Sequence, residues 1–106
     1  MATIKSTDET FDNIIKENKI VLTDFWASWC SPCLTLAPIL EELSDELKDK
    51  GVVIVKHNID EEPNLPVKFS VRGIPTMTLH VDSQHKDTKV GLTTKSDLKS
   101  WIEQNI

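Results

Sequence analysis

The chain has 106 residues, of which 39% are hydrophobic and 27% are charged, with only three glycines and five prolines. This length and composition are typical of a single folded domain over residues 1–106, and they exclude a disordered, collagenous or low-complexity chain. The net charge is −5, Arg72 is the single arginine and the lysines are scattered among the acids, which argues against nucleic acid as a partner.

The N-terminal residues Met1 to Ser6 have neither the long apolar core nor the cleavage site of a secretory signal. The apolar run from Ile20 to Trp26 is too short to span a membrane, and Thr23 and Asp24 interrupt it. We therefore expect a soluble, cytoplasmic protein with no membrane partner. We also expect it to be a monomer.

A first helix is predicted by a capping box, in which Ser6 caps the helix and Glu9 reaches back to its start. The helix should run to about Glu17, because apolar residues follow at helical spacing at Phe11, Ile14 and Ile15.

The segment from Ile20 to Trp26 is rich in β-branched and aromatic residues and is apolar on both faces. This pattern is typical of a central strand covered on both sides, and Asp24 is its exception. A long helix is predicted from Ser31 to about Leu47, where apolar residues recur at helical spacing. We expect a kink near Pro38, which removes an interior hydrogen bond.

Gly51 ends that helix, and Val52 to His57 is a short apolar run typical of a buried strand. The segment from Glu62 to Phe69 contains two prolines, so any helix there should be short or irregular. A strand from about Thr76 to Val81 follows Gly73-Ile74-Pro75.

The last third of the chain predicts a polar turn over Asp82 to Asp87, a short strand over Thr88 to Val90, and a helix over Lys95 to Gln104 that Thr94 caps. The element order is β-α-β-α-β-α-β-β-α, with no residues assigned to the opening strand. This order indicates an α/β fold, in which helices flank both faces of a mixed sheet that is mainly parallel and has an antiparallel edge.

The cysteines, Cys30 and Cys33, lie three positions apart at a strand-to-helix junction, which places both on one face of the first helical turn. Free N–H groups at a helix N-terminus stabilise a thiolate, so Cys30 is the expected nucleophile. Pro32 suits the first turn and fixes the distance between the sulfurs. Cys30 would attack a substrate disulfide, and Cys33 would then attack the Cys30 sulfur and release the reduced substrate.

Two other interpretations of the cysteines compete with redox chemistry, namely inert buried thiols and half of a zinc site. A zinc site needs two more ligands, and His80 and His85 lie far beyond zinc-finger spacing from Cys33. A disulfide over so short a loop would stabilise the fold very little, whereas Cys-x-x-Cys in a βαβ pattern is a recognised redox signature. The redox interpretation is therefore favoured.

Asp24 precedes Cys30 on the strand that leads into the helix. If it is buried, its pKa should be raised, and it would then accept a proton from Cys33 directly or through a water. Lys56, near the end of the next strand, would lie alongside and modulate it. The alternative is an edge carboxylate and a solvated lysine, because buried charges are rare.

The peptide bond before Pro75 could be cis and expose backbone groups beside Cys30 to an incoming peptide strand. Trp29, Ile74 and Gly91 would form an apolar rim suited to flexible protein segments. Taken alone, an X-Pro bond is far more often trans and a tryptophan more often only packs, so both expectations depend on context.

Motifs along nearly the whole chain resemble the thioredoxin family in order and spacing. They are Asp24-Phe25-Trp26-Ala27-Ser28-Trp29-Cys30-Ser31-Pro32-Cys33, Ala37-Pro38, Asn58-Ile59-Asp60, Arg72-Gly73-Ile74-Pro75-Thr76 and Lys89-Val90-Gly91. The resemblance implies the thioredoxin fold, a cis bond before Pro75, and Asp24 with Lys56 as the proton-handling pair.

The resemblance also implies a protein-disulfide reductase and electron donor with a redox-active Cys30–Cys33 disulfide, no bound cofactor and no metal. Its partners would be disulfide-containing protein substrates and an NADPH-dependent thioredoxin reductase. The implied substrate-binding residues are Trp29, Ser31, Pro32, Ile74, Pro75 and Gly91.

The chain departs from the family pattern at Ser31, where glycine is usual, and at Leu34, where a basic residue is usual. A cation that would favour the thiolate is absent, so we expect a less acidic Cys30 and altered partner choice. A hydrogen bond from Ser31 to the thiolate would oppose this effect. His80 and the Asp82-Ser83 turn also depart from the pattern, at the edge hairpin.

Two rival functions remain. An oxidant or isomerase of the same fold would favour a histidine between its cysteines and an oxidising compartment, and Ser31 and Pro32 stand there instead. A binding module that uses the apolar rim without turnover would tolerate the loss of both cysteines.

Overall fold

The computed structural model describes residues 3–106 and contains a five-stranded mixed sheet in the strand order β1-β3-β2-β4-β5. The strands are β1 (Ile4–Lys5), β2 (Ile20–Trp26), β3 (Val52–Asn58), β4 (Thr76–Val81) and β5 (Gln84–Val90). The helices are α1 (Phe11–Glu17), α2 (Ser31–Leu47), the 3-10 helix η1 (Lys48–Lys50), α3 (Asn64–Lys68) and α4 (Lys95–Gln104). This order confirms the predicted α/β sequence of elements and supplies its opening strand.

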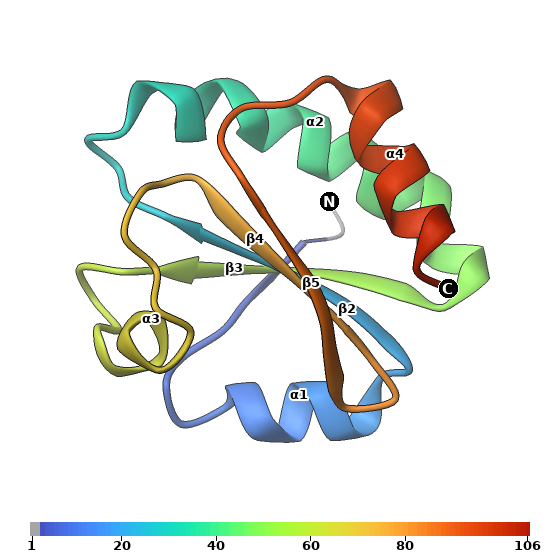
Figure 1. Ribbon diagram of the computed structural model, residues 1–106, viewed down its shortest axis with the longest axis horizontal. Coiled ribbons are helices and arrows are strands. Elements are labelled where there is room, and N and C mark those ends of the chain that lie inside the picture. The colour runs from blue at the N-terminus through green and yellow to red at the C-terminus, as the bar shows by residue number, and fades with distance from the viewer. Residues whose placement is uncertain (1–2) are drawn as a thin grey trace.

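Helices cover both faces of the sheet, with α2 and α4 on one side and α1 and α3 on the other (Figure 1). Side chains alternate between the faces of a strand, so each face has a core of its own. The larger core joins the sheet to α2 and α4, and its members include Leu22, Leu36, Leu40, Met77 and Leu98. The second core, under α1 and α3, contains Phe11, Phe25 and Leu65.

Strand β2 lies in the middle of the sheet, parallel to β3 and antiparallel to β4. Every residue of β2 except Trp26 is buried, which explains its continuous apolar character. The expectation of a mainly parallel sheet was wrong, because β4 and β5 pair in antiparallel fashion, β4 with β2 and β5 with β4. The connection to β4 holds only the five-residue α3, and it returns the chain to the sheet in the opposite direction.

The predicted capping box at Ser6 was also wrong, because α1 begins at Phe11. Ser6 continues the strand pairing instead, since its N–H donates to the Lys56 carbonyl at 2.9 Å. Its side chain is buried, and its Oγ lies 2.8 Å from Nδ1 of His57. Tertiary pairing with β3 therefore overrides the local capping signal.

His57 extends this contact to a third segment. Its Nε2 lies 3.1 Å from Oδ1 of Asp8 and 3.0 Å from the Glu62 carbonyl. Partial burial raises the pKa of the Asp8 carboxyl. The carboxyl also accepts hydrogen bonds from the N–H groups of Leu65 and Asn64, and together with the nearby His57 these bonds hold its pKa below the usual range. Because Ser6 and His57 are fully buried, we regard this Ser-His-Asp chain as structural.

The two helices after β2 follow the sequence prediction. Helix α2 spans Ser31–Leu47 with Pro38 inside it, and α3 is short, as its two prolines indicated. Gly51 takes a left-handed φ of 78° after η1 and thereby ends this helical segment.

The β4–β5 hairpin is tighter than expected. Strand β5 begins at Gln84 rather than Thr88, so the polar turn contains only Asp82 and Ser83, with φ values of 51° and 68°. Positive φ at both residues is the geometry of a two-residue hairpin turn. Strand β5 is an exposed edge strand, and its residues are mostly polar, so the sequence lacks the apolar alternation that would predict a strand from Gln84.

Within residues 3–106, no helix has the length and apolar character needed to cross a bilayer. Met1 and Ala2, at the start of the segment searched for a secretory signal, lie outside the described residues.

Candidate redox site

The two cysteines form a disulfide at the start of α2, with their Cα atoms 5.2 Å apart. Cys30 is the N-cap residue, and its Sγ accepts the N–H of Cys33 at 3.2 Å. Cys30 is 5% exposed and Cys33 is fully buried. The outer sulfur thus occupies the position where helix N–H groups favour a negative charge, and the inner one lies one turn away.

The local sequence explains this arrangement. A short turn follows β2, closed by the Cys30 N–H, which donates to the Ala27 carbonyl at 3.2 Å. Pro32 lies in the first turn of α2, where backbone N–H groups have no partner within the helix, so its missing N–H costs no hydrogen bond. The N–H of Leu34 donates to the Cys30 carbonyl at 3.1 Å and begins the regular helix.

Asp24 is fully buried in the central strand, so the alternative of an edge carboxylate is excluded. By strand alternation it shares a face with Leu22, the face that α2 covers. Neither carboxylate oxygen has a hydrogen-bond partner among residues 3–106. Burial raises the pKa of Asp24 to about 7, and the nearby Lys56 cation acts in the opposite direction.

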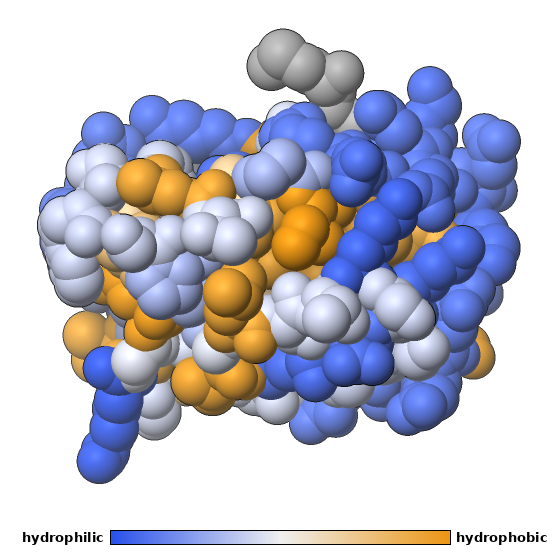
Figure 2. Space-filling view, turned by 90° about the horizontal axis from the view of Figure 1, so that it is seen from above, coloured by the Kyte–Doolittle hydropathy of each residue, from blue (hydrophilic) through white to orange (hydrophobic). Residues whose placement is uncertain are grey.

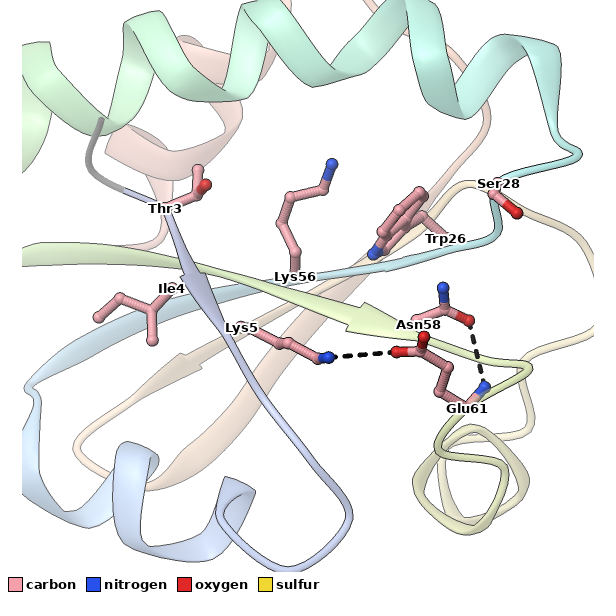
Figure 3. A pocket seen from close by; sticks show the side chains of 8 residues that line it. All are labelled: Thr3, Ile4, Lys5, Trp26, Ser28, Lys56, Asn58 and Glu61. Carbon is pink, nitrogen blue, oxygen red and sulfur yellow. Dashed lines mark hydrogen bonds and ion pairs between the residues drawn. The ribbon is translucent and has the colours of Figure 1, made fainter.

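Lys56 lies opposite Asp24 in the parallel β2–β3 register, so the sequence correctly predicted that the two would lie alongside one another. Its Nζ is 4.2 Å from the centre of the Trp26 ring, and Figure 3 shows the two side chains together on the side of the sheet that carries α2. An open pocket of about 460 Å³ adjoins them, with a Lys5–Glu61 ion pair of 3.2 Å at its other side. Lys56 is therefore accessible from this pocket while Asp24 is not exposed.

The peptide bond between Ile74 and Pro75 is cis, as expected. The Ile74 carbonyl oxygen lies 3.8 Å from Sγ of Cys30, and the Pro75 carbonyl accepts the N–H of Gly91 at 2.8 Å. Gly91 has a φ of 96°, which a side chain would disfavour. These contacts place the Ile74–Pro75 segment beside the outer cysteine and join Gly91 to that segment.

The predicted apolar rim contains exposed and packed members. Trp29 is 68% exposed, and its Nε1–H donates to Oδ2 of Asp60 at 2.8 Å. Ile74 packs on the cluster of Ala27 and the two cysteines. Ser31 and Pro32 are exposed beside Cys30, and Pro75 is buried.

Sequence reasoning gave no role to Asp60, although it belongs to a motif of the family resemblance. Its bond to the Trp29 indole fixes the orientation of an otherwise exposed ring. The signal that the sequence offered was the Asn58-Ile59-Asp60 motif, and in the structure the Asn58 side chain accepts the Asp60 N–H at 2.9 Å.

The zinc interpretation requires further ligands, and the histidines lie elsewhere. His57 is bound to Ser6 and Asp8, and His80 stacks on His85 with ring centres 5.3 Å apart. Within the described part of the chain, no three His, Cys, Asp or Glu side chains gather into a possible metal cluster.

Comparisons with known proteins agree with this geometry. The family model described as Thioredoxin matches residues 2–104. A curated thioredoxin of Rickettsia bellii is 50% identical over 101 residues, which cover 94% of this chain and 95% of the relative. One of Acidithiobacillus ferridurans is 43% identical over 101 residues, with 94% and 93% covered.

A solved structure, that of a mutant thioredoxin from Halobacterium salinarum, superposes with a TM-score of 0.91 at 32% identity. The match covers 98% of this chain and 90% of that one.

Proposed function

Because the chain belongs to the thioredoxin family, we propose that Cys30 attacks substrate disulfides, Cys33 resolves the intermediate and Asp24 handles the proton. The protein is a protein-disulfide reductase that acts by thiol–disulfide exchange, and the Cys30–Cys33 pair is its redox centre. The observation that carries the assignment of roles is the placement of Cys30 at the N-cap of α2 with Cys33 buried one turn inside.

In the reduced protein, the Cys30 thiolate attacks one sulfur of the substrate disulfide. A Cys30–substrate bond forms, the substrate disulfide breaks, and the departing sulfur leaves as a thiolate that takes a proton from solvent. The N–H of Cys33 and the start of α2 stabilise the negative charge on Cys30 before the attack.

In the second step, Cys33 loses its proton and attacks the Cys30 sulfur. The Cys30–Cys33 bond forms, the mixed disulfide breaks, and the second substrate sulfur leaves. The substrate gains two electrons and the cysteine pair loses two. This step is fast because the attacking thiol is already held beside its target.

Asp24 supports the second step as proton acceptor. Its raised pKa of about 7 means that the carboxylate is a far better base than an exposed aspartate, and it lies on the same face of the sheet as α2. Lys56 opposes the effect of burial and keeps Asp24 able to ionise near neutral pH. Lys56 acts through Asp24, as a positioning residue.

The surface around Cys30 suits an extended peptide. The proposed substrate-binding residues are Trp29, Ser31, Pro32, Ile74, Pro75 and Gly91. The 3.8 Å separation of the Ile74 carbonyl from Cys30 Sγ supports a place for peptide backbone beside the reacting sulfur.

The wider role follows from the family. We propose that a thioredoxin reductase returns the disulfide to the dithiol, and that the protein works as a monomer of one domain over residues 1–106. A cytoplasmic location suits this cycle, because that compartment keeps thiols reduced. The dithiol then serves as an electron donor to reductive enzymes.

Insulin-disulfide reduction driven by dithiothreitol tests the proposed role of Cys30. Cys30→Ser should lose catalysis, whereas Ser100→Ala, an exposed serine on α4, should retain it. Equal activity of Cys30→Ser and the unaltered protein would remove the assignment and favour the non-catalytic binding module.

A further inference from the structure

An open groove of about 480 Å³ lies between α2 and the start of α4. It is lined by Thr35, Ile39, Leu92, Thr93, Thr94 and Asp97. Figure 2 looks down on the layer of α2 and α4, and it shows apolar and weakly polar residues gathered toward the end where α2 begins, with charged residues over the other end.

The groove is continuous with the reactive surface. Leu92 follows Gly91, whose N–H is bound to the Pro75 carbonyl, and the Ile74 carbonyl next to it faces Cys30 Sγ. On the other side, Thr35 and Ile39 lie one turn apart on the helix that Cys30 caps. A peptide bound at Cys30 can therefore extend into the groove without leaving the surface.

The walls of the groove favour an apolar occupant. Leu92 is 51% exposed, and with Ile39 on α2 it gives the groove an apolar lining that an apolar side chain of a substrate can contact. The Thr35 hydroxyl donates to the Ser31 carbonyl at 3.2 Å, and the Thr94 hydroxyl accepts the Asp97 N–H at 3.1 Å. These polar atoms already have partners, and Asp97 is the one charged side chain among the described residues of the lining.

The helix geometry sets how far the groove lies from Cys30. Thr35 and Ile39 follow Cys30 by five and nine positions, so they lie about 7 and 13 Å along the helix axis. An extended peptide advances about 3.3 Å per residue. A side chain about two to four residues from the reacting cysteine would thus reach the groove.

We propose that this groove is a specificity subsite of the reductase, which takes a large apolar side chain two to four residues from the reactive cysteine of the substrate. The inference rests on the proposed function, because it assumes that Cys30 receives the substrate disulfide. It names the substrate class as disulfides flanked by apolar rather than polar residues.

The test uses short synthetic peptides whose single cysteine is a mixed disulfide with thionitrobenzoate, so that release of thionitrobenzoate reports each reaction. The reduced protein is in excess over the peptide and is the only reductant present. Each peptide carries Leu or Gln three residues before or after the cysteine. The unaltered reduced protein should show a second-order rate constant about tenfold higher for Leu than for Gln on at least one side. A Leu-to-Gln ratio below about twofold on both sides overturns the proposal.

Variants localise the preference. Leu92→Ser should reduce the Leu-to-Gln ratio to about twofold, whereas Val67→Ser, which alters an exposed valine on α3, should leave it unchanged. Thr35→Lys should raise the rate for a Glu peptide relative to Gln by several-fold, an effect that salt weakens. Ratios between peptides cancel any change in the Cys30 thiolate itself.

The remaining outcomes are also decisive. Equal loss of the ratio in Leu92→Ser and Val67→Ser would overturn the subsite. If Cys30→Ser released thionitrobenzoate as fast as the unaltered protein, the proposed function would fail, whatever the ratio. A normal rate with no preference would leave the reductase intact and remove only the groove.

Discussion

Asp24 lies directly opposite Lys56 in the parallel pair of β2 and β3, with the carboxylate fully buried and the lysine side chain over the Trp26 ring. The pair is unequal, because burial acts on the acid more strongly than the cation does and raises its pKa to about 7. A charged residue in the central strand lowers stability at neutral pH, and a carboxyl with a pKa shifted in this way fits a role in proton transfer.

Replacement of Asp24 should stabilise the oxidised protein. The pKa of this carboxyl is 3.8 in the unfolded chain and about 7 in the folded protein. Its contribution to stability is therefore complete below pH 3.8 and is lost as the pH rises through 7. Asp24→Ala should therefore raise the free energy of unfolding at pH 8 by up to about 4 kcal/mol and flatten its fall between pH 4 and 7. Denaturant unfolding across this range measures both effects, with Asp45→Ala, an exposed acid, as the control.

His80 should make the protein sensitive to acid. Burial, then the neighbouring His85 and Lys68, lower its pKa from 6.5 to about 4. Stability from the neutral ring is complete above pH 6.5 and is lost as the pH falls through 4, at a cost of about 3 kcal/mol. His80→Phe keeps an aromatic ring beside Phe11 and Phe69 and should remove most of this loss. The check is the thermal unfolding midpoint measured as a function of pH. An equal fall in the midpoints of both proteins between pH 6.5 and 4 would contradict this expectation.

Leu34 should leave Cys30 less acidic than a basic residue at that position would. Leu34 is 52% exposed one turn after Cys30, so Leu34→Lys adds a cation near the thiolate without disturbing the core. The midpoint of the Cys30 alkylation rate against pH should fall by a few tenths of a unit. Leu34→Gln controls for the loss of the apolar side chain, and an unchanged midpoint in Leu34→Lys would refute the expectation.

Cys33→Ser should arrest the cycle after the first step. The buried inner sulfur is the proposed resolving thiol, so its loss leaves Cys30 joined to the substrate. Mass spectrometry of the variant after exposure to an oxidised protein should detect a mixed disulfide at Cys30. Recovery of free Cys30 at the rate of the unaltered protein would show that another group resolves the intermediate.

Ser6→Ala should destabilise the fold by about 1–3 kcal/mol, because it leaves a ring nitrogen of buried His57 without its 2.8 Å partner. Ser100→Ala, at an exposed position of α4, should change stability by less than about 0.5 kcal/mol. Chemical denaturation of both variants at pH 7 provides the comparison.

Strong periodic segments could be predicted from the sequence. The limits of β2 and α2 agreed with the patterns in Ile20–Trp26 and Ser31–Leu47, because burial on both sides or along one helical face imposes a clear apolar repeat. The position of the cysteines at the start of α2 and the pairing of Asp24 with Lys56 could be predicted once β2, α2 and β3 were placed.

The errors occurred where distant contacts decide local structure. Ser6 has a partner 51 residues away in His57, so its capping signal was overridden. Strand β5 is an exposed edge without apolar alternation, and the direction of β4 depends on a connection that carries no periodic signal. The groove beside Leu92 forms only when α2 and α4 pack together.

The Ile74 carbonyl that faces Cys30 and the Gly91 N–H that binds the Pro75 carbonyl lie more than 40 residues beyond Cys30 in the chain. A fragment that ended before Ile74 would keep both sulfurs and lose the backbone that faces them. Such a peptide would still carry the Cys30 and Cys33 thiols but would lack one wall of the surface that contacts a substrate, so selectivity requires the second half of the chain as well as the first.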